Sequence, residues 1–409
     1  MTIPDDAPEL LAYVHFPYCL EKCPYCDFVS YARERSTIDH AGYGAAVEAE
    51  LAARAGSFSG RRLTSVFFGG GTPSLWRAAC LGSVLAALRG RIGRGDGADV
   101  AGGGEAPELE VTVECNPTSL DRQHAEALSE VGVNRLSVGV QSLDDAELKF
   151  LGRLHDSAEA LGTLREVLAS SIARISADLI VGLPDQAPEK AAEHASRLAD
   201  LGLRHLSVYQ LTIEPGTRFG ELAKRGRLPM ADDGRVAECF LAVHETLERY
   251  GLAHYEISNF AVPGEESRHN LGYWRGREYL GLGTGAVGFV RDGMMGVRYK
   301  NEIDPSRYMA RTQSVRPGLP AEGDGLSGNV ERIDGETILK ERIMLGLRLA
   351  QGFDLEAAAR ELGVEAWPQD RTRALEGLER RGRVVREGTR LRIPPSAWLF
   401  TDDTAARLF

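Results

Sequence analysis

The stretch YVHFPYCLEKCPYCDF, residues 13–28, places Cys19, Cys23 and Cys26 in the spacing Cys-x3-Cys-x2-Cys, with no fourth cysteine beside them. A structural zinc ion takes four ligands, so a zinc site would need His15 as well. His15 lies in a predicted strand and points away along the chain, which makes a zinc site hard to build. A disulfide between two of the cysteines would leave the third thiol unpaired. An iron–sulfur cube normally takes four thiolates, so three thiolates leave one iron with an open position for a small ligand.

The stretch begins in the first of six predicted strands that alternate with helical patterns. Strands rich in Val, Ile and Leu that alternate with helices predict an α/β fold with a parallel sheet buried on both faces. Six such units predict a (β/α)6 partial barrel with its chemistry at the carboxyl ends of the strands. The predicted strands are 10–16, 64–70, 109–115, 134–142, 174–184 and 204–213, and helices are expected at 41–56, 80–90 and 124–132.

Three regions are expected along the chain. Residues 1–250 form the barrel core, and residues 251–314 form an aromatic, glycine-rich and irregular extension across one end of it. Residues 330–409 hold three helical patterns and an alternating stretch that predicts a hairpin turning near Gly388, which together indicate a winged-helix-like domain. The segment 90–107 is glycine-rich without apolar periodicity and predicts a mobile surface loop. A phosphate-binding loop is disfavoured there, because no Gly-Lys-Ser/Thr follows.

Composition argues against several classes of function. The net charge is −11 and no basic stripe is visible, which disfavours a nucleic-acid binder and favours a small-molecule or protein partner. No apolar run approaches the ~18 residues of a membrane span, and the acidic amino terminus does not resemble a secretory signal. The other cysteines, Cys80, Cys115 and Cys239, are scattered, so we expect a cytoplasmic protein rather than a disulfide framework.

Polar and glycine residues follow the predicted strands. In FFGGGTPS, Gly70 and Gly71 would let a ligand approach the backbone, and Thr72 would start a helix; the two interpretations are compatible. A lone polar residue at a strand end is more often a helix cap than a ligand. Four of them on successive units, at the catalytic end of one barrel, indicate a ligand site: Glu114, Gln141, Arg153 and Asp178.

The cysteine motif, on the loop after the first strand, resembles that of the radical S-adenosylmethionine (SAM) superfamily, including the aromatic Tyr25 before the last cysteine. The resemblance implies that the cysteines bind a [4Fe–4S] cluster whose fourth iron chelates SAM. An electron from the cluster would then cleave SAM to a 5′-deoxyadenosyl radical. The order of motifs resembles the oxygen-independent coproporphyrinogen III oxidase-like branch almost throughout the chain. That implies a SAM site of Tyr13, Gly70, Gly71, Thr72, Glu114, Gln141, Arg153 and Asp178.

This branch contains a radical SAM oxidative decarboxylase of porphyrin biosynthesis and a heme chaperone that transfers heme to acceptors such as respiratory cytochromes. The oxidase carries a fourth cysteine just after the third ligand and a longer amino-terminal extension. Here Asp27 and Phe28 follow Cys26, and few residues precede the first strand. Both departures favour the chaperone, with the oxidase as the alternative. A plain iron–sulfur electron carrier would leave the GGGTP element and the polar strand ends unexplained.

The motif His-Asn-x-x-Tyr-Trp comprises His269, Asn270, Tyr273 and Trp274. From the residues alone, a histidine within an aromatic mini-core is the simpler interpretation. The resemblance implies heme contact instead, with His269 as the first candidate ligand. We expect the cluster and SAM at the top of the barrel, under the layer of residues 250–290, and heme at or near that layer. Val287 stands where relatives often carry a histidine.

Overall fold

The computed structural model describes residues 7–92 and 108–409. Its core is a run of six strands that pair in chain order, all parallel, which confirms the predicted α/β architecture. Within the described residues the two edge strands of this sheet, β14 and β9, do not pair with each other, so the barrel is open. The six strands are β1 (Glu9–Phe16), β4 (Arg62–Gly70), β5 (Glu110–Cys115), β6 (Arg135–Gln141), β7 (Arg174–Val181) and β8 (His205–Gln210).

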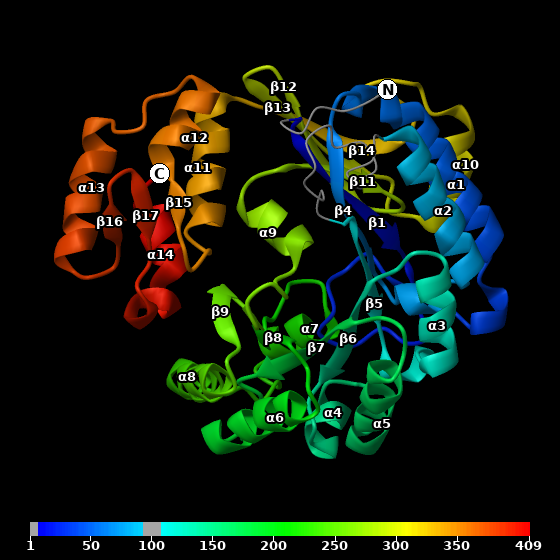
Figure 1. Ribbon diagram of the computed structural model, residues 1–409, viewed down its shortest axis with the longest axis horizontal. Coiled ribbons are helices and arrows are strands. Elements are labelled where there is room, and N and C mark those ends of the chain that lie inside the picture. The colour runs from blue at the N-terminus through cyan, green and yellow to red at the C-terminus, as the bar shows by residue number, and fades with distance from the viewer. Residues whose placement is uncertain (1–6, 93–107) are drawn as a thin grey trace.

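Most helices of this region cover the outer face of these strands, whereas residues 218–224 pack against the cysteine loop, where the Phe219 N–H donates to the Pro24 carbonyl (Figure 1). Several begin at an aspartate whose carboxylate accepts a backbone N–H of the first turn, and Asp156 forms a full capping box with Glu159. The helices are α1 (His40–Arg54), α2 (Ala78–Arg91), α3 (Arg122–Glu130), α4 (Asp145–Phe150), α5 (Ser157–Leu168), α6 (Pro188–Asp200), α7 (Arg218–Lys224) and α8 (Asp233–Arg249).

The strands are buried on both faces, and their side chains alternate between helices and barrel interior. In β4, Phe68 packs against Trp76 on the helix side, with ring centroids 6.3 Å apart. Its neighbour Phe67 points into the interior and stacks on Tyr13 of β1. Period-two alternation therefore gives the barrel an interior that combines aromatic and polar side chains.

Residues 251–314 differ from the expected irregular layer. They form regular strands that extend the sheet at both edges, because β10 pairs with β8 while β11 pairs in parallel with β1. The elements are β9 (Ala253–Glu256), β10 (Asn259–Ala261), α9 (Arg268–Trp274), β11 (Glu278–Leu282), β12 (Val287–Asp292), β13 (Met295–Asn301) and α10 (Pro305–Arg311). The following β14 (Ser327–Ile333) pairs with β13 and still belongs to this sheet.

The carboxyl-terminal region forms its own small domain beside the barrel (Figure 1). It has a separate apolar core, and its hairpin turns at Gly388, where φ is +63°. The elements are α11 (Gly335–Gly346), β15 (Phe353–Asp354), α12 (Leu355–Leu362), α13 (Gln369–Arg380), β16 (Val385–Glu387), β17 (Arg390–Arg392) and α14 (Thr401–Ala406). Helices plus a three-stranded sheet agree with the expected winged-helix-like pattern.

Two further sequence predictions concern the glycine-rich segment 90–107 and membrane spans. Gly90 and Arg91 belong to α2 rather than to the predicted loop 90–107, most of which lies outside the described residues. Over residues 7–92 and 108–409, no helix has the length and apolar character needed to cross a membrane.

One buried carboxylate ties α1 to the added strands. Glu50 is fully buried and accepts hydrogen bonds from Arg54 Nε (2.8 Å), Asn301 Nδ2 (2.7 Å) and Tyr308 Oη (2.7 Å). It also accepts the backbone N–H of Gly283 at 2.9 Å. Arg54 is buried too, and its charge is balanced by Glu50 and by the more distant Asp324, at 3.5 Å.

We therefore expect Glu50→Ala to lower the free energy of unfolding by about 3–5 kcal/mol, because it leaves the buried Arg54 guanidinium with only Asp324, 3.5 Å away, as a counter-ion and removes the acceptor of Asn301, Tyr308 and Gly283. Urea denaturation followed by tryptophan fluorescence measures the loss. Glu48→Ala, on the same helix and only half-buried, is the control and should change stability by less than about 1 kcal/mol. Equal effects of the two substitutions would contradict the structural role of Glu50.

Candidate functional site

The three motif cysteines lie on the loop that leaves β1, partly within β2 (Tyr18–Cys19), which pairs with β3 (Tyr31–Ala32). Each thiol has a polar neighbour. Thr72 Oγ1 donates to Cys19 Sγ at 3.4 Å, and Arg153 Nη1 donates to Cys23 Sγ at 3.4 Å. Ser30 Oγ lies 3.9 Å from Cys26 Sγ.

These surroundings fit an iron–sulfur cube better than zinc. Among the described residues, no three His, Cys, Asp or Glu side chains are grouped around a single metal ion. A cube binds each thiolate at a different iron, so it uses sulfurs spread more widely, and donors to the sulfurs tune it. His15 is not available as a fourth ligand, because its Nδ1 bonds Tyr13 Oη (3.0 Å) and its Nε2 donates to the carbonyl of Val29 (2.7 Å).

Close packing requires glycine at two positions of the turn that ends β4. Gly70 has φ +111°, and a Cβ there would lie 2.4 Å from the His15 ring. A Cβ on Gly71 would lie 2.7 Å from the carbonyl oxygen of Tyr18. The turn thus brings bare backbone to the cysteine loop, and Gly70 N–H donates to Glu114 Oε2 at 3.0 Å.

Two carboxyl groups face the barrel interior beside this turn. Burial and then the nearby Asp178 raise the pKa of Glu114 to about 8. Burial also raises the pKa of Asp178 to about 6, although hydrogen bonds from Ser207 and Ser137 oppose the shift. A ligand that brings positive charge or hydroxyl groups to this end of the barrel would favour the ionised carboxylates.

Gln141 and Arg153 meet beside Gly139. Gln141 has φ +68°, an uncommon conformation for a residue other than glycine, and such outliers cluster at ligand sites. A Cβ on Gly139 would lie 2.8 Å from Gln141 Nε2 and 3.5 Å from Arg153 Nη2. Arg153 also donates to the Gly139 carbonyl at 2.8 Å, and its buried Nε has no hydrogen-bond partner. Tyr25 packs nearby against Phe219, with ring centroids 6.3 Å apart.

The structure therefore gathers the residues predicted for the cluster and SAM at the carboxyl ends of β1 and β4–β7. Their roles stay predictions. Sequence reasoning did not find the donors Ser30 and Ser137, which carry no motif signal.

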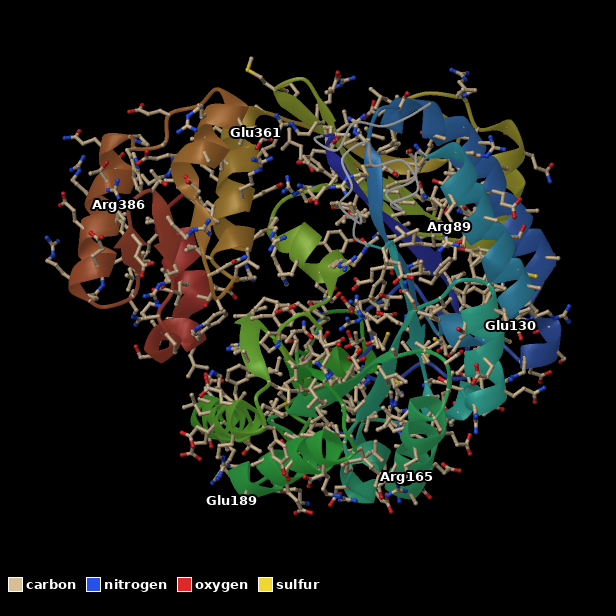
Figure 2. The ribbon with its side chains drawn as sticks, viewed as in Figure 1. Arg89, Glu130, Arg165, Glu189, Glu361 and Arg386 are labelled. Carbon is tan, nitrogen blue, oxygen red and sulfur yellow. The ribbon has the colours of Figure 1, made fainter. Side chains whose placement is uncertain are left out.

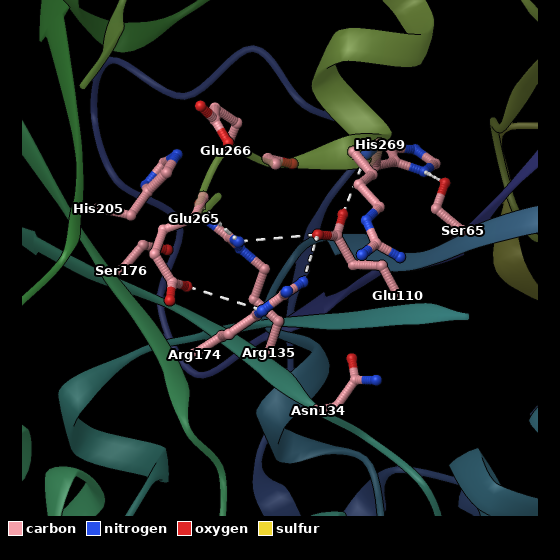
Figure 3. Close-up of polar contacts among 12 residues, drawn as sticks. Ser65, Glu110, Asn134, Arg135, Arg174, Ser176, His205, Glu265, Glu266 and His269 are labelled. Atoms are coloured by element: carbon pink, nitrogen blue, oxygen red, sulfur yellow. Dashed lines mark hydrogen bonds and ion pairs between the residues drawn. The ribbon is translucent and has the colours of Figure 1, made fainter. Parts of the chain in front are cut away.

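The His-Asn-x-x-Tyr-Trp motif lies in α9, which Figure 1 shows between the barrel strands and the carboxyl-terminal domain; Figure 3 labels His269 among its polar neighbours. The His269 N–H donates to Glu110 Oε1 at 3.0 Å, and His269 Nδ1 lies 2.8 Å from Ser65 Oγ. Glu110 is the first residue of β5, and Ser65 lies in the first half of β4. α9 therefore does not lie over the cluster as expected, because it is anchored to the amino-terminal halves of the strands. Another part of the expected layer does approach the cysteine loop, since a Cβ on Gly285 would lie 2.9 Å from Val29.

His269 is packed inside the barrel. It is 1% exposed, stacks on Phe67 with centroids 5.0 Å apart, and meets the Tyr273 ring edge-on at 4.8 Å. Burial lowers the pKa of His269 to about 3, so the ring is neutral. Its Nε2 has no hydrogen-bond partner. In this arrangement the ring positions Tyr273.

The other three residues of the motif line a cavity of about 580 Å³ between the barrel and α11, whereas His269 does not. Such a volume is typical of cavities that bury small-molecule ligands. Sequence reasoning missed the wall from α11, because an amphipathic helix does not reveal which partner it faces. The lining residues from both sides are Tyr209, Glu256, Ile257, Ser258, Asn259, Asn270, Tyr273, Trp274, Gly276, Arg277, Tyr279, Phe289, Arg298, Ile338, Glu341, Arg342, Met344 and Leu345.

Comparison with known proteins agrees with this arrangement. The chain matches the radical SAM superfamily over residues 13–198 and the HemN C-terminal domain over residues 333–400. The solved coproporphyrinogen III oxidase HemN from Escherichia coli, described as a radical SAM enzyme, has a TM-score of 0.78 over 98% of this chain and 90% of its own, at 19% identity. The fold and the cysteine site thus define a radical SAM protein, which implies a [4Fe–4S] cluster and SAM.

Curated relatives refine the class. The heme chaperone HemW of Escherichia coli is 37% identical over 284 residues, 69% of this chain and 71% of its own. HemW of Mycobacterium tuberculosis is 32% identical over 354 residues, 85% of each chain. The mitochondrial radical S-adenosyl methionine domain-containing protein 1 of Danio rerio is 35% identical over 357 residues, 86% of this chain and 75% of its own. The chain belongs to the oxygen-independent coproporphyrinogen III oxidase-like family, in the group that includes HemW.

The raised pKa of Glu114 predicts a specific pH dependence of stability. The folded state keeps a proton up to about pH 8, whereas the unfolded chain releases it near the ordinary value of 4.5. The stability from this group is therefore fully present below about pH 4.5 and is lost as the pH rises toward 8. We expect the unfolding free energy of ligand-free wild type, relative to Glu114→Gln, to fall between about pH 5 and about pH 8 in urea denaturation.

The matched control is Glu193→Gln on α6, whose carboxylate is 63% exposed. Its stability should run parallel to that of wild type over the same pH range. A Glu114→Gln curve that also runs parallel to wild type would contradict a buried, protonated Glu114.

Proposed function

We propose that this protein is a heme chaperone, which binds heme in the cavity between α9 and α11 and transfers it to acceptor proteins such as respiratory cytochromes. The observation that carries the proposal is the cavity itself. It is lined by Asn270, Tyr273 and Trp274, and its walls include further aromatic and aliphatic side chains. Aromatic faces suit a flat porphyrin. The kinship with HemW supports the same assignment.

In this proposal His269 is a positioning residue rather than an iron ligand. Its ring lies between Phe67 and Tyr273, and its Nδ1 is engaged by Ser65. Among the residues that line the cavity, Met344 and the tyrosines offer atoms that bind heme iron in other proteins. His269 would then fix the face that Tyr273 presents to the porphyrin.

The proposal also assigns the residues at the carboxyl ends of the strands to the binding of the cluster and SAM. Cys19, Cys23 and Cys26 would bind the cluster, which supplies the electron for SAM cleavage when bound. Thr72 and Arg153 donate to two of the sulfurs, and Glu114 and Asp178 lie where they would receive the cationic and hydroxyl groups of SAM. Tyr13, Tyr25, Gly70, Gly71 and Gln141 complete this proposed site. The six cysteines are free, which supports a reducing, cytoplasmic setting.

The second candidate is the oxygen-independent coproporphyrinogen III oxidase. The observation that favours it is the fold, which follows the solved HemN oxidase over nearly the whole chain. Asp27 and Phe28 stand where the oxidase motif continues with a cysteine, so the chaperone is the stronger proposal.

We expect Trp274→Ala to raise the dissociation constant for heme at least about tenfold, because it removes an aromatic wall of the cavity. Titration of heme into reconstituted protein under anaerobic conditions, followed at the Soret band, measures this. Trp367→Ala is the control, since Trp367 belongs to the carboxyl-terminal core and does not line the cavity. Porphyrin products are analysed in the same samples. Formation of protoporphyrinogen from coproporphyrinogen with SAM and a reductant would favour the oxidase and contradict the proposal.

Cluster binding is tested separately. We expect Cys23→Ala to lose most bound iron and acid-labile sulfide after anaerobic reconstitution, because two thiolates cannot hold the cube. Cys80→Ala, which changes a cysteine outside the motif, should keep both. If Cys23→Ala retains the full iron and sulfide content, the assignment of the motif is wrong.

A further inference from the structure

The lining of the proposed heme cavity combines apolar side chains with charged groups. Its apolar part includes Trp274, Phe289 and Leu345. Arg277 and Arg342 mark one part of the lining, called here the first end. The buried carboxyl group of Glu256 marks another part, the far end, where Glu256 bridges to Leu349 beyond α11.

Two arginines flank Gly276 at the first end. Arg277 follows it in sequence, and a Cβ on Gly276 would lie 3.1 Å from Arg342 Cγ and 3.3 Å from Arg342 Nε. The Arg277 side chain is 47% exposed, and its Nε lies 3.0 Å from Glu9. Both residues line the cavity. Glycine at position 276 lets Arg342 pack directly over the backbone.

Positive charge exceeds negative charge around this end. The paired arginines are Arg61, Arg62, Arg277, Arg291 and Arg342, and their carboxylates are Glu9, Glu278 and Glu361. Glu361, shown on the carboxyl-terminal domain in Figure 2, accepts hydrogen bonds from Arg342 Nη1 (2.7 Å) and Nη2 (2.9 Å) and lies 3.4 Å from Arg291 Nη1. Its side chain is 57% exposed, so a propionate that binds Arg342 would replace a solvent-accessible carboxylate. The pKa of Arg291 is lowered, first by burial and then by the charge of Arg342. The buried Nε atoms of Arg62, Arg291 and Arg342 have no hydrogen-bond partner. In a chain of net charge −11, this is a local cationic site.

The remaining charged groups do not extend this site. Arg298 is neutralised by Glu341, whose two oxygens both lie 2.6 Å from Arg298 Nη2. At the far end Glu256 is fully buried, and burial raises its pKa to about 7. An anion placed there would face this carboxyl group. The nearby cation Arg348, whose guanidinium lies 5.8 Å from the Trp274 ring centroid, is already paired with Asp402 at 2.5 Å.

We propose that Arg277 and Arg342 bind the two propionates of heme, and that the cavity selects a tetrapyrrole with carboxylates on one edge only. The inference rests on the proposed function and deepens it. Heme has an apolar body and two propionates at one edge, which matches the cationic end and the apolar walls. A tetrapyrrole with four propionates, such as coproheme, would have to bury carboxylates along the apolar walls or beside Glu256.

The test uses reconstituted full-length protein and three iron porphyrins: heme, heme dimethyl ester and coproheme. We expect wild type to bind heme at least about tenfold more tightly than either other ligand, since charged hydrogen bonds are lost in the ester. We expect Arg277→Gln to weaken heme binding about tenfold and to leave ester binding unchanged. Arg342→Gln should behave likewise. The control Arg332→Gln, at a 64% exposed arginine outside the cavity, should change neither.

Failure of this inference differs from failure of the proposed function. If wild type binds heme and the dimethyl ester equally and Arg277→Gln has no effect, the propionate assignment is overturned while heme binding stands. If wild type binds coproheme as tightly as heme, the one-edge selection is overturned. If wild type binds none of the three, the proposed function falls and this inference with it. The ester comparison needs only wild type, so it holds even where Arg342→Gln fails to fold.

Discussion

The carboxylate of Glu110 fixes the position of α9 and thereby of the cavity. Glu110 is buried at the start of β5, accepts the His269 N–H, and lies 3.7 Å from Arg135 and 3.8 Å from Arg174 (Figure 3). A buried carboxylate is costly unless it is paired and hydrogen-bonded, so each of these partners is needed. Arg135 also donates to the carbonyl of Glu265, just before α9. One ionic cluster thus holds α9 against the barrel interior.

The two ends of the open barrel serve different sites. The carboxyl ends of the strands gather the cysteine loop, the glycine turn and the carboxyl groups, as a parallel sheet requires. The amino-terminal half is filled by α9, whose Tyr273 and Trp274 face outward to the cavity. Tyr209 of β8 connects the two regions, since it lines the cavity while its phenol has a raised pKa, first because of burial and then because of the charges of Asp178 and Glu114.

The sequence contained enough local information to predict the six strands, the strand-end residues and the hairpin at Gly388. Each depends on patterns within a few residues, such as Val-rich runs and Cys-x3-Cys-x2-Cys. The position of α9 depends instead on Ser65 and Glu110, which are more than 150 residues away in sequence. The pairing of β11 with β1 is equally remote, and no periodicity in residues 251–314 reveals it. For that reason sequence reasoning predicted neither the regular strands of residues 251–314 nor the position of α9 at the amino-terminal halves of the barrel strands.

The cavity has one wall on the barrel and the other on α11 of the carboxyl-terminal domain. Any ligand that touches both walls contributes part of its binding free energy to the association of the two domains. By thermodynamic linkage this coupling is reciprocal. If the ligand strengthens the association of the two domains by some factor, separating α11 from the barrel weakens ligand binding by the same factor. The carboxyl-terminal domain would therefore influence the affinity of the cavity for a ligand as well as pack against the barrel.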